Sequence, residues 1–123
     1  MSLKGLEGSQ YTDKVLSSKA TSPASGELSL SSKTDRVYTP VDGPSVPIDI
    51  SEAGKRKFTI ARDNLQEVVV WNPWQDGAQD IGDFAPKDGW KEMICVEAGA
   101  VKGWQKLEAG ETFEGGQVIV AAN

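Results

Sequence analysis

Short runs of alternating apolar and polar residues recur along the chain and predict β-strands. Residues 27–31 and 45–51 alternate with a period of two, as half-buried strands do. Residues 57–62 alternate in the same way, and the dipeptide Asp63-Asn64 is a turn signal. Residues 67–71 are apolar enough to form a strand that is buried on both faces. No stretch shows helical periodicity over three turns.

Further strands are predicted on either side of these two. Pro73 ends the strand that precedes it, because proline cannot donate a ladder hydrogen bond. Residues 75–89 predict a long loop, and a loop of this length inside a domain is often functional. The remaining segments are strands at 11–16, 36–38, 91–96 and 112–121, and a loop at 17–26. Seven to nine short strands indicate an all-β fold, an antiparallel β-sandwich.

Composition narrows the class of protein. The chain has 123 residues, of which 38% are hydrophobic, enough for one globular domain. Its net charge of -5 argues against a nucleic-acid partner, which needs a basic face. The longest apolar run, Val68-Val69-Val70-Trp71, is too short for a membrane span. Met1-Ser2-Leu3 carries no structural pattern and is expected to be an expression remnant.

The chain contains no histidine and a single cysteine, Cys95. One cysteine forms no internal disulfide, and with no signal-peptide core it favours a cytoplasmic location. The lack of histidine excludes Ser-His-Asp and Cys-His catalysis. Acid–base chemistry near neutral pH must therefore use carboxylates, Lys, Tyr or Cys, or a residue from elsewhere. The aspartates of the 75–89 loop do not have EF-hand spacing, so no metal site is predicted.

Three segments could carry chemistry. Glu97 follows a predicted buried strand, and is either a solvent-facing charge or a partly desolvated carboxylate suited to acid–base work. Trp71 and Asn72 combine an indole face with an amide, which suits a sugar, but an indole here could equally belong to the core. Asp35 could hydrogen-bond a pair of hydroxyls, or form an exposed ion pair with Arg36.

Six segments share their order and spacing with one family. They are Gly5-Leu6-Glu7-Gly8 with Tyr11-Thr12-Asp13-Lys14-Val15, Thr34-Asp35-Arg36-Val37-Tyr38, Val69-Val70-Trp71-Asn72-Pro73-Trp74, Asp83-Phe84-Ala85-Pro86-Lys87-Asp88-Gly89-Trp90, Met93-Ile94-Cys95-Val96-Glu97, and residues 107–116. Together they resemble the hexose-6-phosphate mutarotases (glucose-6-phosphate 1-epimerases) of the aldose 1-epimerase superfamily. The resemblance runs from about Gly5 to the C-terminus.

The resemblance implies that residues 1–123 are the C-terminal part, roughly the second half, of a galactose-mutarotase-like supersandwich. It also implies an isomerase that interconverts the α and β anomers of a hexose 6-phosphate without a metal or organic cofactor. A base takes the proton of the C1 hydroxyl while an acid protonates the ring oxygen. The ring then opens, the aldehyde rotates, and the ring closes on its other face.

The resemblance assigns roles to four residues. Glu97 matches the catalytic base and Asp35 matches an aspartate that binds the sugar, while Trp71 and Asn72 lie in a segment near the cleft. The family's acid is a histidine of the first half, so we expect this chain to be inactive alone. The alternative is a non-catalytic carbohydrate-binding fragment. Sheet surface that a whole protein covers would be exposed here, so we also expect self-association.

Overall fold

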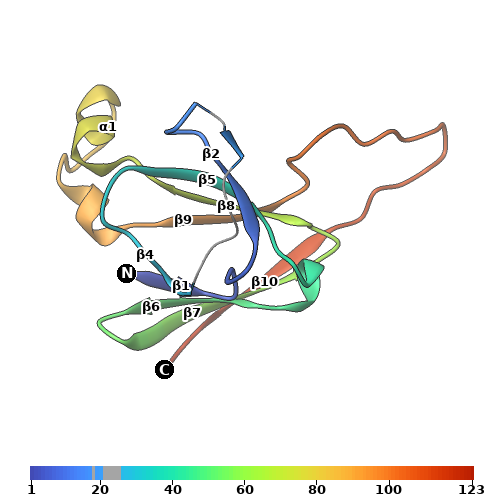
Figure 1. The fold of residues 1–123 in the computed structure, drawn as a ribbon, viewed down its shortest axis with the longest axis horizontal. Coiled ribbons are helices and arrows are strands. Elements are labelled where there is room, and N and C mark those ends of the chain that lie inside the picture. Colours follow the sequence, from blue (N-terminus) through green and yellow to red (C-terminus); the bar gives the residue numbers. More distant parts are fainter. Residues whose placement is uncertain (18, 21–25) are drawn as a thin grey trace.

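The protein is built from two five-stranded antiparallel sheets that face each other (Figure 1). The structure is a computed structural model that describes residues 1–17, 19–20 and 26–123. Its elements are β1 Ser2–Lys4, β2 Gln10–Asp13, β3 Lys19–Ala20, β4 Leu28–Ser29, β5 Thr34–Thr39, η1 Gly43–Ser45, β6 Ile48–Glu52, β7 Lys55–Asp63, β8 Glu67–Asn72, α1 Trp74–Asp80, η2 Gly89–Glu92, β9 Cys95–Gly99 and β10 Gly116–Ala121.

Sheet A has the strand order β10-β7-β6-β1-β4, and sheet B has the order β3-β2-β5-β8-β9. The predicted antiparallel β-sandwich is therefore confirmed. Alternate side chains of both sheets point inward and exclude water from the space between them, which supplies most of the driving force for folding. The core contains Leu3, Leu6, Tyr38, Ile48, Ile50, Ile60, Val68 and Val70.

The first residues are part of this core. Residues 2–4, where no structure was expected, form β1, which pairs with β4 on one side and β6 on the other. Leu3 is 1% exposed. A three-residue segment is too short to show a period of two, so its strand character comes from its two neighbours.

Strands β7 and β8 and the turn between them confirm the clearest local prediction, although the two strands lie in different sheets and do not pair with each other. β7 contains the alternating segment 57–62, and β8 contains 67–71. Asn64 adopts a φ of 55° in the turn between them, a conformation that Asn tolerates better than most residues. In contrast, the strand expected at 11–16 ends at Asp13, because the Asp13 carboxylate accepts hydrogen bonds from the backbone N–H groups of Val15 and Leu16.

The long loop predicted at 75–89 is only partly present, because residues 81–88 form turns and bends while helices occupy both ends. Trp74–Asp80 forms helix α1, and Gly89–Glu92 forms the short helix η2. Lys87 holds the end of α1 from outside, because its Nζ donates hydrogen bonds to the carbonyl oxygens of Ala78 and Ile81. A Cβ at Gly77 would lie 2.9 Å from the Cβ of Pro73, so the first turn needs a glycine.

The strand expected at 91–96 begins later than predicted. Residues 89–92 belong to η2, and β9 runs from Cys95 to Gly99, where it pairs with β8. It is also not buried on both faces, because Glu97 is exposed. Part of the loop expected at 17–26 lies outside the described residues, and Lys19–Ala20 forms β3.

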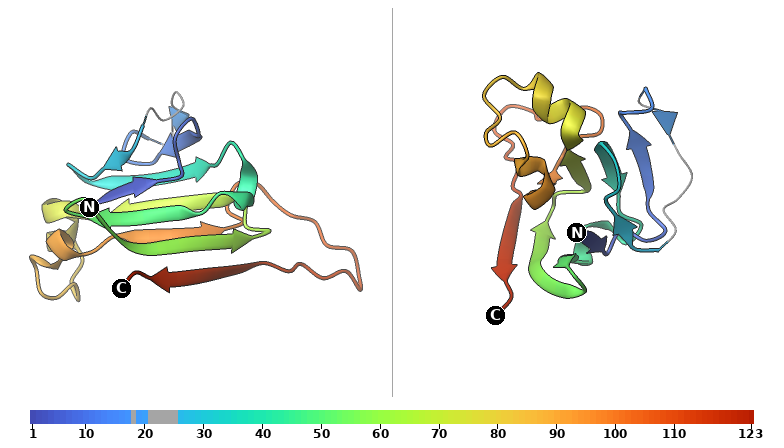
Figure 2. Two further views of the ribbon diagram at one scale, coloured as in Figure 1. Left: turned by 90° about the horizontal axis from the view of Figure 1, so that it is seen from below. Right: turned by 90° about the vertical axis from the view of Figure 1, so that its left-hand side faces the viewer.

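A long arm, residues 100–115, connects β9 to β10 and projects from the body at the end opposite α1 (Figure 2). The buried Glu67 carboxylate holds the base of the arm, because its oxygens accept hydrogen bonds from the backbone N–H groups of Val101 and Lys102. Trp104, on the arm, is fully exposed. The arm therefore contributes little to the core described above.

Candidate functional site

The outer face of sheet B brings three of the four predicted site residues together. Directly opposed residues of an antiparallel pair point to the same face of the sheet. Asp35 on β5 lies opposite Trp71 on β8, and Trp71 lies opposite Cys95 on β9. Two residues further along the strands, the next set of opposed residues on the same face of sheet B includes Glu97 on β9. Asp35, Trp71 and Glu97 therefore share one face.

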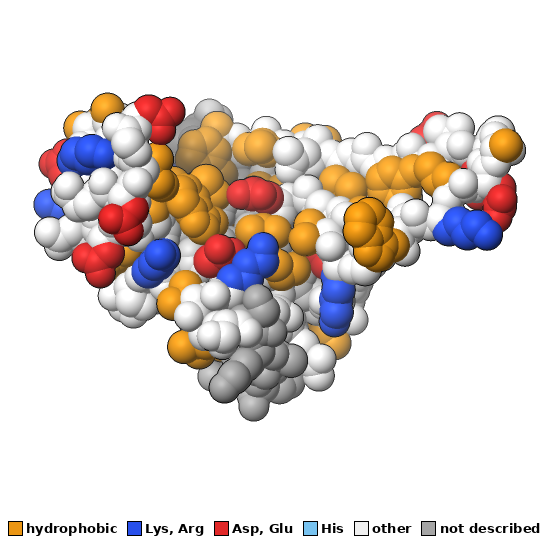
Figure 3. Space-filling model, turned by 90° about the horizontal axis from the view of Figure 1, so that it is seen from above, with side chains coloured by type: hydrophobic (Ala, Val, Ile, Leu, Met, Phe, Trp, Pro, Cys, Tyr) orange, Lys and Arg blue, Asp and Glu red, His pale blue; other side chains and the backbone are white. Residues whose placement is uncertain are grey.

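The two carboxylates stand apart on this face. Their strands are separated by β8, and their rows by two residues, so their Cα atoms are roughly 12 Å apart. Half-buried Trp71 and Val69 lie between them. The outer face of sheet B, seen in Figure 3, has hydrophobic side chains at its centre with acidic and basic side chains among them. A small polar molecule with one apolar face could contact both carboxylates and the indole.

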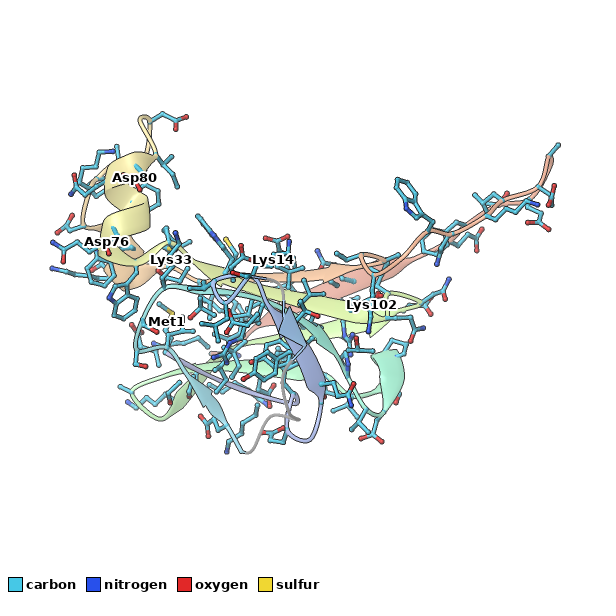
Figure 4. The ribbon with its side chains drawn as sticks, turned by 45° about the horizontal axis from the view of Figure 1, so that its top comes forward. Met1, Lys14, Lys33, Asp76, Asp80 and Lys102 are labelled. Carbon is cyan, nitrogen blue, oxygen red and sulfur yellow. The ribbon has the colours of Figure 1, made fainter. Side chains whose placement is uncertain are left out.

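Successive side chains of a strand point to opposite faces, so Asp35 lies on this face of sheet B and Arg36 lies on the other. The ion pair of Arg36 is with Asp13, whose Oδ2 lies 3.1 Å from the arginine Nε, and the Arg36 guanidinium lies 4.5 Å from the centre of the Tyr11 ring. The simple reading of Asp35 as the ion-pair partner of Arg36 is therefore wrong. Lys33 lies at the α1 end of the sheet and Lys102 at the arm end (Figure 4).

Glu97 is exposed, which favours the reading of a solvent-facing charge over that of a desolvated carboxylate in this chain. Its charge nevertheless acts on its neighbour. Burial raises the pKa of the Cys95 thiol, and the nearby Glu97 carboxylate raises it further. The thiol is half-buried, so Cys95 behaves as a small apolar residue with little thiolate at neutral pH.

Asn72 points to the opposite side from Trp71 and is 1% exposed. Its Nδ2 donates to the carbonyl oxygens of Trp90 and Met93, each at 2.9 Å, and its Oδ1 accepts from the backbone N–H of Trp74 at 2.8 Å. These bonds tie the end of β8 to α1 and to the segment that enters β9. In this chain the amide therefore positions backbone, and its predicted role in sugar binding stays a prediction.

Sequence reasoning missed a hollow of about 250 Å³ beside Asn72. Trp74 and Trp90 form part of its wall, with ring centres 4.6 Å apart, and the Lys91 ammonium lies 5.6 Å from the centre of the Trp90 ring. Trp74 adopts a φ of 57°, which is unusual for a bulky residue. Both tryptophans lie in segments that the sequence analysis quoted, but their separation of 16 residues along the chain hid their contact.

The described residues contain no cluster of three or more His, Cys, Asp or Glu side chains that could hold a metal ion. Within the same part of the chain, no helix has the length and apolarity needed to cross a membrane. What the fold and the outer face define is an all-β sandwich with two carboxylates and an indole on one sheet face.

Comparison with known proteins adds the family. Three curated proteins are similar, each named "Putative glucose-6-phosphate 1-epimerase". That of Cenchrus ciliaris is 31% identical over 113 residues, covering 92% of this chain and 33% of the relative. That of Escherichia coli K12 is 34% identical over 107 residues (87% and 35%), and that of Salmonella typhimurium LT2 is 32% identical over 90 residues (73% and 30%). No family model matches the chain.

The chain is therefore a partial-length relative of the glucose-6-phosphate 1-epimerases, and the resemblance drawn from the sequence is confirmed. It spans about a third of the length of the curated relatives it matches, not the half that was expected.

The placement of Glu97 beside Cys95 can be tested without substrate. We expect Glu97→Gln to speed alkylation of Cys95 by iodoacetamide at pH 8 about two- to threefold, because a carboxylate charge a few ångströms away no longer disfavours the thiolate. Alkylation is followed by mass spectrometry, and Cys95 is the chain's one thiol. Glu108→Gln, on the arm, is the matched control. Equal rates in both variants would contradict the shared face.

Proposed function

We propose that this chain supplies the general base and part of the sugar-binding face of a hexose-6-phosphate 1-epimerase. The observation that carries the proposal is that Glu97, Trp71 and Asp35 lie on one face of sheet B. The names of the curated relatives support the reaction and the sugar phosphate substrate. The lone cysteine supports a reducing, cytoplasmic setting.

Each residue has a definite task in this reaction. The Glu97 carboxylate accepts the proton of the C1 hydroxyl, and Asp35 accepts a hydrogen bond from another sugar hydroxyl. Trp71 lies under the apolar C–H face of the ring. The ring oxygen must gain a proton as the C1–O bond to it breaks, and this chain has no histidine to give it. In the family that the chain resembles this acid is a histidine, so we propose that the acid comes from outside this chain.

The exposure of Glu97 leads to the same requirement. A base works best where water is excluded and the sugar is held in one orientation. The outer face of sheet B offers Glu97 without a cover. Whatever supplies the acid would also have to cover this face, and a positioned acid of this kind contributes about 10²–10⁴-fold to the rate.

Chemical rescue tests the proposal. Interconversion of the glucose 6-phosphate anomers is measured by saturation-transfer NMR with the chain, with imidazole, and with both. We expect the chain alone to add little to the buffer rate. Imidazole replaces the missing acid, so the two together should exceed the sum of their separate rates several-fold. Glu97→Gln should abolish the excess, and Glu108→Gln should keep it.

The same samples distinguish the alternative, a non-catalytic sugar-binding fragment, which the exposed Glu97 and the lack of histidine favour. Under that alternative, glucose 6-phosphate shifts the amide signals of Trp71 and Glu97 but no excess exchange depends on Glu97. Saturating sugar phosphate that leaves both signals unmoved would exclude the epimerase role and the binding role together.

A further inference from the structure

Strand β10 is the one long, uncharged sheet edge in the described part of the chain. Of the four edge strands, β3 and β4 have two residues each, and β9 carries the exposed charge of Glu97 at its centre. Such short or charged strands resist pairing with other chains. β10 has six residues without a charge, and among the described residues it pairs with β7 alone (Figure 2).

The side chains of β10 are exposed on both faces of the sheet. Val118 is 61% exposed, Ile119 57% and Val120 55%. Ile119 lies opposite Ile60 and so shares the inner face of sheet A, while its two neighbours point outward. A second strand beside β10 would cover apolar surface on both faces at once.

We propose that β10 pairs in antiparallel fashion with β10 of a second copy of this chain, about a two-fold axis at Ile119, so that the two copies of sheet A become one continuous sheet.

The backbone hydrogen bonds define which groups are available at this edge. The N–H of Ala122 donates to the carbonyl oxygen of Lys57 at 2.8 Å, so the polar backbone groups of residue 122 point to β7. Because these groups alternate in direction along a strand, those of Val118 and Val120 also point to β7. The N–H and C=O groups of Gln117, Ile119 and Ala121 therefore face the free edge.

Symmetry then fixes the register. A two-fold axis perpendicular to an antiparallel sheet requires one residue to lie opposite its own copy. With Ile119 at the axis, Gln117 lies opposite Ala121 of the second copy. The three residues whose backbone groups face the free edge all pair in this register, giving about six hydrogen bonds. Val118 then lies opposite Val120 of the second copy. No charge meets a like charge across the join.

The strength of this contact follows from its size. One six-residue strand pair buries on the order of several hundred Å² per copy, less than the roughly 800 Å² per partner of a stable standard interface. We therefore expect a reversible dimer with a dissociation constant of about 10⁻⁵ M. Each copy carries a net charge of -5, so added salt should tighten the dimer by screening repulsion.

Sedimentation velocity between about 1 μM and 1 mM, with hydrogen exchange at both limits, tests the proposal. We expect a shift from monomer to dimer as concentration rises. The amides of Gln117, Ile119 and Ala121 should exchange quickly in the monomer and at least tenfold more slowly in the dimer. The amides of Val118 and Val120, which already face β7, should change little and are internal controls.

Two variants complete the test. Ile119→Pro removes a backbone N–H that faces the free edge and leaves the hydrogen bonds between β10 and β7 intact. Ile119→Lys places two like charges at the two-fold axis. Both should remain monomers with an unchanged circular dichroism spectrum, and Val41→Lys, at a 69% exposed position away from the edge, should dimerise as the parent does. A monomer at 1 mM, a dimer without the alternating protection, or dimerisation of both Ile119 variants would overturn the proposal. This inference does not depend on the sugar chemistry.

Discussion

Replacing Tyr38 with alanine is expected to lower the free energy of unfolding by about 4 kcal/mol, in the range found for aromatic core residues. Tyr38 is 0% exposed and is the largest fully buried side chain. Its ring lies 4.9 Å from that of Tyr11, and its hydroxyl oxygen accepts a hydrogen bond from Nη1 of Arg36 at 3.1 Å. The change therefore leaves a cavity in the core and an unpaired donor on Arg36.

Urea denaturation measures the effect. The matched control is Phe58→Ala, an aromatic truncation in sheet A where the side chain is 44% exposed, and it should cost about 1 kcal/mol. Tyr38→Phe keeps the ring and removes the hydroxyl, and it should cost about 1–2 kcal/mol. A Tyr38→Ala variant no less stable than Phe58→Ala would mean that the two sheets do not close on this ring.

The same residue makes stability depend on pH. Burial raises the pKa of Tyr38, while the Arg36 guanidinium opposes this shift. The folded state thus holds the phenol proton at pH values where the unfolded chain, with a tyrosine pKa of about 10, releases it. The unfolding free energy must therefore fall as pH rises above about 10. In Tyr38→Phe this loss should be smaller.

What could be predicted from the sequence is what depends on local pattern. Strands β7 and β8 carry their apolar patterns and the turn between them within one short stretch, so both strands and the turn were found, but not that the turn passes the chain from sheet A to sheet B. The shared face of Asp35, Trp71 and Glu97 could not be found in this way, because it depends on how β5 and β9 align with β8. A register change of one residue on either strand would have moved a carboxylate to the other face.

The structure of α1 and the surroundings of Asn72 and Glu97 could not be predicted, because contacts between parts of the chain that are distant in sequence decide these features. Helix α1 has seven residues, too few for a helical period to stand out, and Lys87 secures its end from a later segment. Asn72 looked like a ligand residue because two of its three hydrogen-bond partners, the carbonyl oxygens of Trp90 and Met93, lie at positions that only the fold brings near. Glu97 is exposed because no part of the described chain covers the outer face beside it.

A second large effect is expected at Arg62, for which Arg62→Met should lower the free energy of unfolding by about 3 kcal/mol. Arg62 is 8% exposed. One terminal nitrogen donates to the Leu65 carbonyl oxygen at 3.1 Å and to that of Gln66 at 3.4 Å, and the other donates to Gly43 at 2.9 Å and Val46 at 3.4 Å. The guanidinium thus joins the η1 loop to the β7–β8 turn.

The cost comes from the acceptors that remain. Methionine replaces most of the stem but no donor, so four carbonyl oxygens of two turns lose a part-buried hydrogen bond. The Nε of Arg62 has no hydrogen-bond partner among the described residues, so the loss is confined to the two terminal nitrogens. Arg62→Lys should recover only part of the stability, because one ammonium cannot reach both turns in the fixed geometry of a guanidinium.

Thermal and urea unfolding of three variants measure this clamp. Arg56→Met, at an exposed position of the same strand, should stay within about 0.5 kcal/mol of the parent. Hydrogen exchange gives the local signature, since amides of the η1 loop and of the β7–β8 turn should exchange faster together in Arg62→Met than in Arg56→Met. If Arg62→Met and Arg56→Met unfold at the same urea concentration, the buried guanidinium adds no net stability, and the two turns are held by the ladder of β6 and β7 alone.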